Sequence, residues 1–438
     1  MKIDRTHSPD RVSWVASANG HPDFPIQNLP LGVFSPEGEA RRVGVAIGDE
    51  ILDVSELAVA GALKGEALRA AELCRNETLN ELMAADPSLR RALRLAVSDL
   101  LAIDAPDAEP IRRAARRFLH AANNCTMHLP ARIGGFTDFF AGVHHAVTAG
   151  RMMRPNNPLS PNYKYVPIAY NSRVSTIGVS PARVHRPYGQ IVPAGATEPI
   201  MAATQKFDYE FELGVWIGRG NPNGKPIDIS TAAESIFGYC ILNDWSSRDV
   251  QRWEAQPLGP FLAKSTATTI SPWIITPEAL SPFRAMQTPR DAGDPKPLPY
   301  LMNPADQENG ALRVDLDIHL STASMRAAGK VAERISATNS LNLYWTPAQL
   351  VAHHTVNGCV LNSGDIFGTG TISGPDGSGP GCLLEHTLDG ERPLILASGE
   401  QRRYLEDGDE VTLRARCERT GFVSIGFGEN RGEILGTK

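Results

Sequence analysis

The clearest alternation of apolar and polar residues lies in FDYEFELGVWIG, residues 207–218. Its odd positions are apolar throughout, whereas its first even positions are Asp208, Glu210 and Glu212. A period of two predicts a strand with one buried face. Because same-face neighbours in a strand lie about 6.5–7 Å apart, the two glutamates would repel each other unless water or a cation separates them.

Other patterns predict the remaining elements. Residues 31–53 hold three short apolar runs separated by turn residues, which predicts a β-meander in a small sheet or barrel. Residues 55–119 are rich in Ala, Leu, Arg and Glu, and predict helices. Strands and turns dominate beyond residue 122. The last strand-like stretch has these apolar residues alternating with polar ones: Val411, Leu413, Ala415 and Cys417.

These elements predict an α+β, β-rich fold. The chain has 438 residues, which favours two domains. We place the boundary near residue 122, with a small sheet or barrel plus helices over residues 1–122 and a larger domain over residues 123–438. No β-α-β repetition is seen, so a doubly wound parallel sheet is not expected.

Composition and charge argue against several classes of function. The net charge of −6 gives no general attraction to nucleic acid or acidic membranes. The arginines of IRRAARRFL, residues 111–119, read as a solvated helix face because no aromatic residues interleave them. Six scattered cysteines without a C-x-x-C pair indicate reduced thiols and a cytoplasmic protein. The N-terminus has no apolar signal region, so export is not expected.

Further acidic residues suggest what could separate Glu210 and Glu212. Asp138 precedes two aromatic residues in TDFFAGVHH, and Asp244 follows an apolar run in LNDWSSRDVQRWE. The four carboxylates together would form an all-oxygen shell, which selects Mg²⁺ or Ca²⁺ over zinc. The alternative for the two glutamates alone is the solvated face of a half-buried sheet.

The segment after Asp244 predicts a short helix over residues 246–256, where Ser246 and Asp249 have the spacing of a capping box. Arg248 and Gln251 would share one face of this helix. Lys264 follows in an otherwise apolar stretch, where a lone lysine is usually a snorkelling surface residue. Beside a metal, these three side chains would instead form a pocket for a developing anion.

Several long segments resemble the fumarylacetoacetate hydrolase (fumarylacetoacetase) family. They are MHLPARIGGFTDFFAGVHHA, FDYEFELGVWIG, NDWSSRDVQRWEAQPLGPFLAKS, HHTVNGCVLNSGDIFGTGTISGP and IGFGENRGEIL, in family order from about residue 123. The resemblance implies an N-terminal SH3-like barrel, a larger C-terminal mixed β-roll domain and a homodimer. It implies hydrolysis of 4-fumarylacetoacetate to fumarate and acetoacetate, the last step of tyrosine and phenylalanine degradation.

The resemblance also implies roles for individual residues. It makes His145 the catalytic base and Glu385 its orienting acid, although His144 could equally be the base from sequence alone. The implied metal ligands are Asp138, Glu210, Glu212 and Asp244. Oxyanion-pocket residues would be Arg248, Gln251 and Lys264. A second, Mg²⁺-type site would involve Lys264 and Thr268. Substrate would be held by Arg154, Tyr170, Gln251 and Thr371.

Two positions depart from the family pattern. Phe140 and Ala255 stand where the animal enzymes carry tyrosine, so two hydroxyl contacts to substrate would be missing. Phe140 keeps its place among the expected substrate-binding residues.

Two other functions remain open at this point. The first is an acylpyruvate hydrolase or oxaloacetate-type decarboxylase of the same fold, but smaller relatives of that kind lack the long N-terminal domain. The second is a non-enzymatic, metal-stabilised binding protein. Such a protein would need the carboxylates, but it would not need His145, Glu385 and Lys264 together.

Several other polar or aromatic residues are expected to serve packing. Trp245 and Trp253 read as core residues, and Cys359 and Cys382 as buried thiols. Asp365 is expected to make a local hydrogen bond in a turn.

Overall fold

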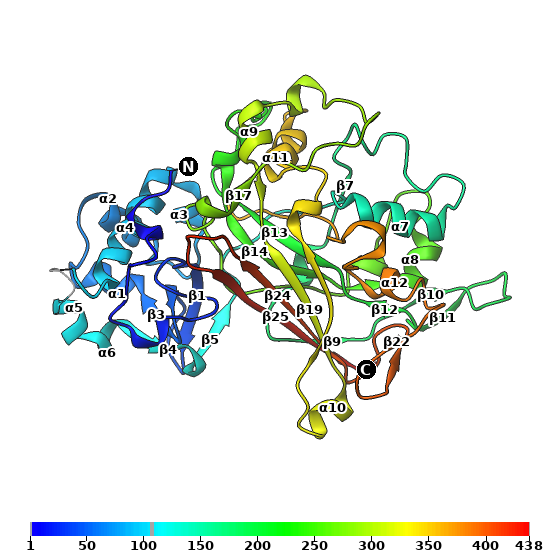
Figure 1. The fold of residues 1–438 in the computed structure, drawn as a ribbon, viewed down its shortest axis with the longest axis horizontal. Coiled ribbons are helices and arrows are strands. Elements are labelled where there is room, and N and C mark those ends of the chain that lie inside the picture. Colours follow the sequence, from blue (N-terminus) through cyan, green and yellow to red (C-terminus); the bar gives the residue numbers. More distant parts are fainter. Residues whose placement is uncertain (1, 106–108, 438) are drawn as a thin grey trace.

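The computed structural model describes residues 2–105 and 109–437. The chain is a mixed α and β protein, in which an N-terminal part lies beside a larger C-terminal part (Figure 1). Within the described residues, no helix combines the length and apolar character needed to cross a membrane.

An antiparallel sheet forms the centre of the N-terminal part. Its strand order is β4-β3-β2-β1-β5, and every pair in it is antiparallel. The strands are β1 (Leu31–Pro36), β2 (Arg42–Ile47), β3 (Glu50–Asp53), β4 (Leu119–Ala121) and β5 (Cys125–His128). The predicted meander over residues 31–53 is therefore confirmed. Strand β5 follows residue 122 in the chain and still pairs with β1.

The predicted helices between residues 55 and 119 are also present, and they cover this sheet (Figure 1). They are α1 (Val54–Val59), α2 (Gly65–Leu73), α3 (Asn80–Ala84), α4 (Pro87–Leu101), α5 (Glu109–Arg113) and α6 (Ala115–Phe118). Helix α4 begins at Pro87, after Asp86 accepts a hydrogen bond from the Ser88 amide. Its Leu89, Leu93 and Val97 recur every fourth residue and are buried. The arginines of α5 and α6 are exposed, as predicted.

Two sheets form the centre of the C-terminal part. The seven-stranded sheet has the order β7-β6-β21-β13-β14-β16-β8 and is mixed, since β6–β21 and β8–β16 are parallel pairs. Its strands are β6 (Phe136–Phe139), β7 (Ala169–Asn171), β8 (Ile177–Val179), β13 (Phe211–Ile217), β14 (Ile236–Asp244), β16 (Thr268–Ile270) and β21 (Ile366–Gly368).

The second sheet has the order β20-β19-β24-β25-β9. Its strands are β9 (Ala182–His185), β19 (Asp315–Ser321), β20 (Glu333–Asn339), β24 (Glu410–Cys417) and β25 (Ile425–Leu435). The alternating residues 411–417 are buried, as predicted, in one core with Leu213, Val215 and Ile217 of β13. Burial between the two sheets therefore determines the direction in which the odd-numbered residues of β13 point.

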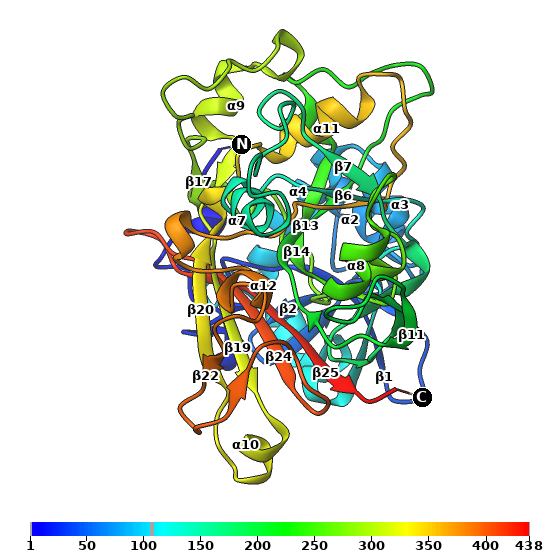
Figure 2. The same ribbon diagram turned by 90° about the vertical axis from the view of Figure 1, so that its right-hand side faces the viewer.

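Short elements complete the C-terminal part. The two-stranded sheets are β10–β11 (Tyr188–Ile191, Ile200–Ala203), β12–β15 (Phe207–Asp208, Ser246–Ser247), β17–β18 (Arg284–Ala285, Ala311–Leu312) and β22–β23 (Leu394–Ile395, Gln401–Arg402). The helices are α7 (Val143–Met153), α8 (Arg248–Glu254), α9 (Pro304–Asn309), α10 (Ala323–Ala327), α11 (Pro347–Thr355) and α12 (Leu383–His386). Helices α7, α8 and α12 gather on the side away from the N-terminal sheet (Figures 1 and 2).

The predicted strand over residues 207–217 differs from the structure in two ways. It is interrupted after Asp208, because the Glu210 amide bonds to the Asn243 side chain instead of a strand backbone. Both faces of β13 are buried, so the prediction of a single buried face was wrong. The even face is covered because Trp216 packs into the core of the N-terminal part.

The helix predicted over residues 246–256 begins later than expected. Ser246 and Ser247 form strand β15, which pairs with β12, and α8 starts at Arg248. The predicted capping box was therefore wrong. Ser246 bonds to the Asp244 carbonyl instead, and the Asp249 carboxylate accepts a hydrogen bond from the Gln205 amide.

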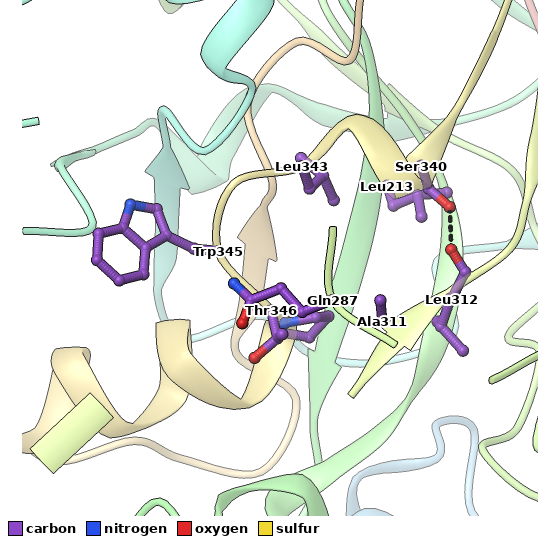
Figure 3. A pocket seen from close by; sticks show the side chains of 9 residues that line it. Leu213, Gln287, Ala311, Leu312, Ser340, Leu343, Trp345 and Thr346 are labelled. Atoms are coloured by element: carbon purple, nitrogen blue, oxygen red, sulfur yellow. Dashed lines mark hydrogen bonds between the residues drawn. The ribbon is translucent and has the colours of Figure 1, made fainter. Parts of the chain in front are cut away.

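A small cavity of about 20 Å³ lies under β13, between the segments 311–312 and 340–347. Figure 3 shows its lining, where the Ser340 hydroxyl donates a hydrogen bond to the Leu312 carbonyl (2.6 Å). This volume holds about one water molecule and no substrate. The cavity is therefore a packing feature.

Candidate active site

Three buried carboxylates meet on three strands of the seven-stranded sheet, β6, β13 and β14, with β21 between the first two. Asp138 lies on β6, Glu212 on β13 and Asp244 at the end of β14, and one oxygen from each lies within 4.8 Å of the others. Each side chain is at most 1% exposed. The alternative that Glu212 belongs to a solvated sheet face is thereby excluded.

Glycine on the intervening strand makes this approach possible. Gly368 on β21 pairs with both Asp138 and Gly214. A Cβ atom at Gly368 would lie 2.5 Å from Asp138 Oδ1 and 2.6 Å from Glu212 Oε2. Any larger residue would push the two carboxylates apart.

The three carboxylates lack enough hydrogen-bond donors. The Tyr170 hydroxyl lies 2.7 Å from Asp138 Oδ2 and 3.0 Å from Asp244 Oδ2, and the Gly370 amide donates to Glu212 Oε2 (2.8 Å). Among the described residues, Asp138 Oδ1 and Glu212 Oε1 have no partner although both are buried. Burial, followed by repulsion from neighbouring carboxylates, raises the pKa of Asp138 and Glu212 well above its usual range. Such an oxygen cluster fits a hard divalent cation.

Glu210 lies beside this cluster and faces two cations. Its Oε1 accepts a hydrogen bond from Arg248 Nη1 (2.6 Å), and its Oε2 accepts one from Lys264. Lys264 also donates to Asp244 Oδ2 (2.7 Å) and so connects Glu210 with the three carboxylates. Burial alone would raise the pKa of Glu210, but Lys264 and Arg248 lower it below its usual range. Glu210 is therefore held as a carboxylate.

His145 and Glu385 meet on the other side of Glu210. His145 lies in α7 and Glu385 in α12, and His145 Nδ1 is 2.9 Å from Glu385 Oε2. His145 Nε2 lies 3.9 Å from Glu210 Oε1. Burial opposes ionisation of Glu385, but the adjacent His145 lowers its pKa below the usual value. The pair has the form of a base oriented by a carboxylate.

These groups surround one cavity of about 80 Å³. Ten of the predicted site residues line it: Asp138, Phe140, His145, Tyr170, Glu210, Glu212, Arg248, Gln251, Lys264 and Thr371. The Phe140 ring stands perpendicular to the His145 ring, with centroids 5.7 Å apart. The Thr371 hydroxyl is buried and has no hydrogen-bond partner among the described residues, so it is available to a ligand.

Other predicted residues lie outside this lining. Asp244 accepts hydrogen bonds from Lys264 and Tyr170, which line the cavity. Glu385 contacts His145, which also lines it. Thr268 Oγ1 is 3.4 Å from Asp244 Oδ1. Arg154 is exposed at the end of α7, where its guanidinium donates to the Pro158 carbonyl (3.4 Å). The structure therefore does not bring Arg154 into the cavity.

Sequence reasoning missed the part that Asp208 plays in the site. Its Oδ2 accepts a hydrogen bond from Arg248 Nε (2.9 Å), and its two oxygens accept the Leu383 and Leu384 amides at the start of α12. Asp208 thus fixes both Arg248 and the helix that carries Glu385. The signal was present in the sequence, because Asp208 is the first of the three acidic residues in the alternating stretch.

The packing predictions had mixed outcomes. Trp245 and Cys382 are buried as predicted, and Asp365 accepts the expected local hydrogen bond from the Asn362 amide. It also accepts a long-range hydrogen bond from the Gly135 amide. Trp253 is 44% exposed and Cys359 is exposed, so both of these predictions were wrong. Trp253 lies on the outer face of the short helix α8, and Cys359 follows the turn at Gly358.

Comparison with known proteins identifies the family. Residues 136–434 match the fumarylacetoacetate (FAA) hydrolase C-terminal family, and residues 27–130 match the fumarylacetoacetase N-terminal family. The chain belongs to the fumarylacetoacetate hydrolase family. The fumarylacetoacetase of Arabidopsis thaliana is 44% identical over 94% of this chain and 96% of its own length. The human fumarylacetoacetase is 40% identical over the same shares of both chains.

The family fold is also seen in a more distant solved structure. A Mycobacterium smegmatis protein assigned as HpcE aligns with a TM-score of 0.51 at 19% identity, covering 93% of this chain and 99% of that chain. This likeness concerns the fold alone.

Proposed function

We infer that this chain hydrolyses 4-fumarylacetoacetate to fumarate and acetoacetate, the last step of tyrosine and phenylalanine degradation. Similarity to fumarylacetoacetases over nearly the whole chain supports this activity. The single observation that carries the chemistry is the His145–Glu385 pair, which stands in one cavity with a cluster of buried carboxylates.

His145 is the proposed general base. Water is a poor nucleophile, and histidine is the usual group that accepts its proton near neutral pH. Because Nδ1 faces Glu385, the free Nε2 is the nitrogen that accepts the proton from water at the fumaryl carbonyl. Glu385 then stabilises the imidazolium that forms. His144 does not line the cavity, which favours His145 over its neighbour.

The carbon–carbon bond breaks when the acetoacetate carbon leaves as an enolate. Arg248, Gln251 and Lys264 are the proposed donors for the oxyanion of the tetrahedral intermediate. Lys264 Nζ and Arg248 Nη1 already lie against Glu210, and Gln251 Oε1 accepts a hydrogen bond from Arg248 (3.2 Å). Two fixed positive charges next to the base favour the negative charge that develops there.

Mg²⁺ or Ca²⁺ is the proposed cofactor, held by Asp138, Glu212 and Asp244 with Glu210 as the fourth carboxylate. Asp138 and Glu212 each have one oxygen without a hydrogen-bond partner among the residues that the structure describes, and Gly368 leaves space beside both side chains. Both observations support this assignment. When bound, such a cation supplies a Lewis acid for the dicarbonyl oxygens. Lys264 and Thr268 are the proposed contacts of a second, Mg²⁺-type site.

Substrate is proposed to contact Phe140, Arg154, Tyr170, Gln251 and Thr371. All of these except Arg154 line the cavity, so Arg154 must turn inward to reach a substrate carboxylate. Phe140 offers the substrate an apolar edge and no hydroxyl, and Ala255 offers no hydroxyl either.

The resemblance also suggests finer structural assignments. We propose that the N-terminal part, divided from the rest near residue 122, is an SH3-like barrel and that the larger domain over residues 123–438 is a β-roll. A cytoplasmic location is proposed because the six cysteines are free.

A homodimer is the proposed assembly. Exposed apolar side chains lie on β10–β11, on α8 and on the segment after α8. Helix α8 packs against β10, and the two lie side by side in Figure 1. They include Tyr188, Ile200, Met201, Trp253, Leu258 and Phe261. Patches of this kind mark protein interfaces.

The reaction is tested by turnover in water labelled with ¹⁸O. Attack at the fumaryl carbonyl places a labelled oxygen in the new carboxylate of fumarate and releases acetoacetate. Attack at the other carbonyl would break the neighbouring carbon–carbon bond and give malonate and 4-oxopent-2-enoate, so mass spectrometry of the products separates the two routes. Malonate as a product, unlabelled fumarate, or no turnover of fumarylacetoacetate at all would contradict the proposed function.

A further inference from the structure

A second group of potential metal ligands lies behind the proposed base. His145 Nδ1, Cys382 Sγ and a Glu385 oxygen approach one another within 4.8 Å, and all three residues are buried. Cys382 Sγ lies 3.3 Å from Glu385 Oε2 and 3.8 Å from His145 Nδ1. The reaction proposed above uses His145 and Glu385 and gives the thiol no part.

We propose that His145, Cys382 and Glu385 form a binding site for a zinc-like divalent ion, and that occupancy of this site switches the enzyme off. Nitrogen, thiolate and carboxylate are the ligands that Zn²⁺ takes, whereas Mg²⁺ and Ca²⁺ avoid sulfur. A zinc-like ion would therefore prefer this group, whereas Mg²⁺ or Ca²⁺ would prefer the all-oxygen cluster around Glu212.

The geometry is close to that of a tetrahedral zinc site. Ligand atoms bound to zinc at its usual bond lengths lie roughly 3.3–3.6 Å apart. The observed separations are 3.8 Å for Nδ1–Sγ, 3.3 Å for Sγ–Oε2 and 2.9 Å for Nδ1–Oε2. Only small side-chain shifts separate this arrangement from coordination.

A neighbouring hydroxyl adds an independent observation. Tyr209 is fully buried, and its hydroxyl has no hydrogen-bond partner among the described residues. Asp208, the chain neighbour of Tyr209, accepts the Leu383 and Leu384 amides, which directly follow Cys382.

The surroundings also support a metal site. Ser373 donates a hydrogen bond to Glu385 Oε2 (2.5 Å) and accepts one from the Gly381 amide, so the carboxylate is oriented by an outer partner, as metal-binding carboxylates usually are. Cys382 packs against Ala149 and Leu384, which line the substrate cavity. The thiol is therefore one side chain away from the cavity.

Binding of zinc would release one proton. The thiol proton leaves to solvent as the Zn–Sγ bond forms, and the ring proton moves from Nδ1 to Nε2 as the Zn–Nδ1 bond forms. The charges of Zn²⁺, thiolate and carboxylate then sum to zero, which suits a buried site. With its proton on Nε2, His145 no longer accepts a proton from water. Inhibition thus rests on the proposed role of His145, whereas metal binding does not.

Cobalt provides a probe that does not depend on activity, because a thiolate bound to Co²⁺ gives a charge-transfer band in the near ultraviolet. The protein is titrated with Co²⁺ while excess Mg²⁺ occupies the oxygen cluster. We expect the band to saturate at one equivalent with release of one proton, and to be absent in Cys382→Ser.

A matched control removes the two thiols that are not buried. The variant Cys125→Ser/Cys359→Ser should keep the band, because the remaining buried cysteines other than Cys382 lie in the hydrophobic cores. This variant decides the question even if Cys382→Ser fails to fold. Loss of the band here, or its persistence in Cys382→Ser, would overturn the proposal.

Zinc inhibition of fumarylacetoacetate turnover is measured in parallel, with each variant normalised to its own zinc-free rate. Cys382→Ser should need at least about tenfold more Zn²⁺ for half inhibition, since losing even an outer partner of a metal ligand costs that much. Equal sensitivity in both proteins would contradict the switch. A cobalt band without zinc inhibition would keep the metal site and remove His145 as the base.

Discussion

His145 and Glu385 come from two different helices, α7 and α12, and meet with Nδ1 2.9 Å from Oε2. This contact leaves Nε2 as the nitrogen that faces the cavity and Glu210. The arrangement gives the imidazole one orientation and one tautomer, which is what a general base requires.

Replacing the base should abolish most of the turnover without disturbing the fold. In His145→Ala we expect kcat to fall about 10²–10⁴-fold, the usual contribution of a general base. The change is read from the loss of substrate absorbance, with circular dichroism as the check on folding. His144→Ala is the matched control and should keep most of its activity. Comparable losses of activity in both variants would contradict the assignment of His145 as the general base.

Glu212 should decide how tightly the enzyme holds a divalent cation. Its Oε1 is one of the two cluster oxygens that have no hydrogen-bond partner in the described part of the chain, so Glu212→Gln removes charge where the cation would bind. We expect the Mg²⁺ or Ca²⁺ concentration at half-maximal activity to rise at least about tenfold, by analogy with changes in other metal sites. The exposed Glu418→Gln serves as the control. An unchanged titration in Glu212→Gln would count against the ligand assignment.

Glu278 links the two parts of the chain and should make stability depend on pH. It accepts two hydrogen bonds of 2.9 Å from Arg90 of α4 in a buried pair. Burial opposes its ionisation, but Arg90 lowers the pKa of Glu278 below its usual value. Its stabilising effect is therefore present above the unfolded pKa of about 4.3 and is lost as pH falls through the lower folded value.

The variant Glu278→Gln should consequently lose about 3 kcal/mol of unfolding free energy at pH 7, because it leaves Arg90 without its buried partner. Urea unfolding followed by tryptophan fluorescence measures the difference. We expect the difference in unfolding free energy between native protein and variant to become smaller as pH falls below about 4. A difference that is constant with pH would show that ionisation of Glu278 is not its source.

The proposed dimer should depend on the apolar surface of β11. Met201 is 69% exposed, and a charge placed there would be buried without a partner in the interface. We expect Met201→Glu to be monomeric in sedimentation velocity at concentrations where the native protein is dimeric. Ile395→Glu, another exposed apolar residue remote from β10–β11 in sequence, should remain dimeric. Equal masses for native protein and Met201→Glu would contradict this interface.

Hydrophobic alternation and acidic spacing are local signals, and they predicted the elements and the carboxylates of the cavity. The family resemblance added Phe140, His145, Tyr170 and Thr371 to the predicted lining. The meander over residues 31–53 and the helices after it follow directly from such patterns. The division near residue 122 and the roles of single residues stay predictions. Tertiary contacts determine where a strand is interrupted and which of its faces are buried, and local patterns do not show these contacts. Asn243 interrupts the alternating strand at Glu210, and Trp216 carries the even face of β13 into a second core.

The site shows the same limit of local patterns. Glu210 and Glu212 look equivalent in sequence, yet Glu210 faces Arg248 and Lys264 while Glu212 joins Asp138 and Asp244. Their difference arises from the break before β13 and from the turn that brings Lys264 in after α8. Asp208 gained its role in the same way, since its partners at Leu383 and Leu384 come from a distant segment.

The most direct measurement is the loss of the diketone absorbance when purified protein meets fumarylacetoacetate after chelation, and again after Mg²⁺ or Ca²⁺ is restored. A cation-dependent enzyme built on Asp138, Glu212 and Asp244 should be nearly inactive with chelator and recover its rate with the added ion. A full rate in the presence of chelator, or no rate under either condition, would contradict it.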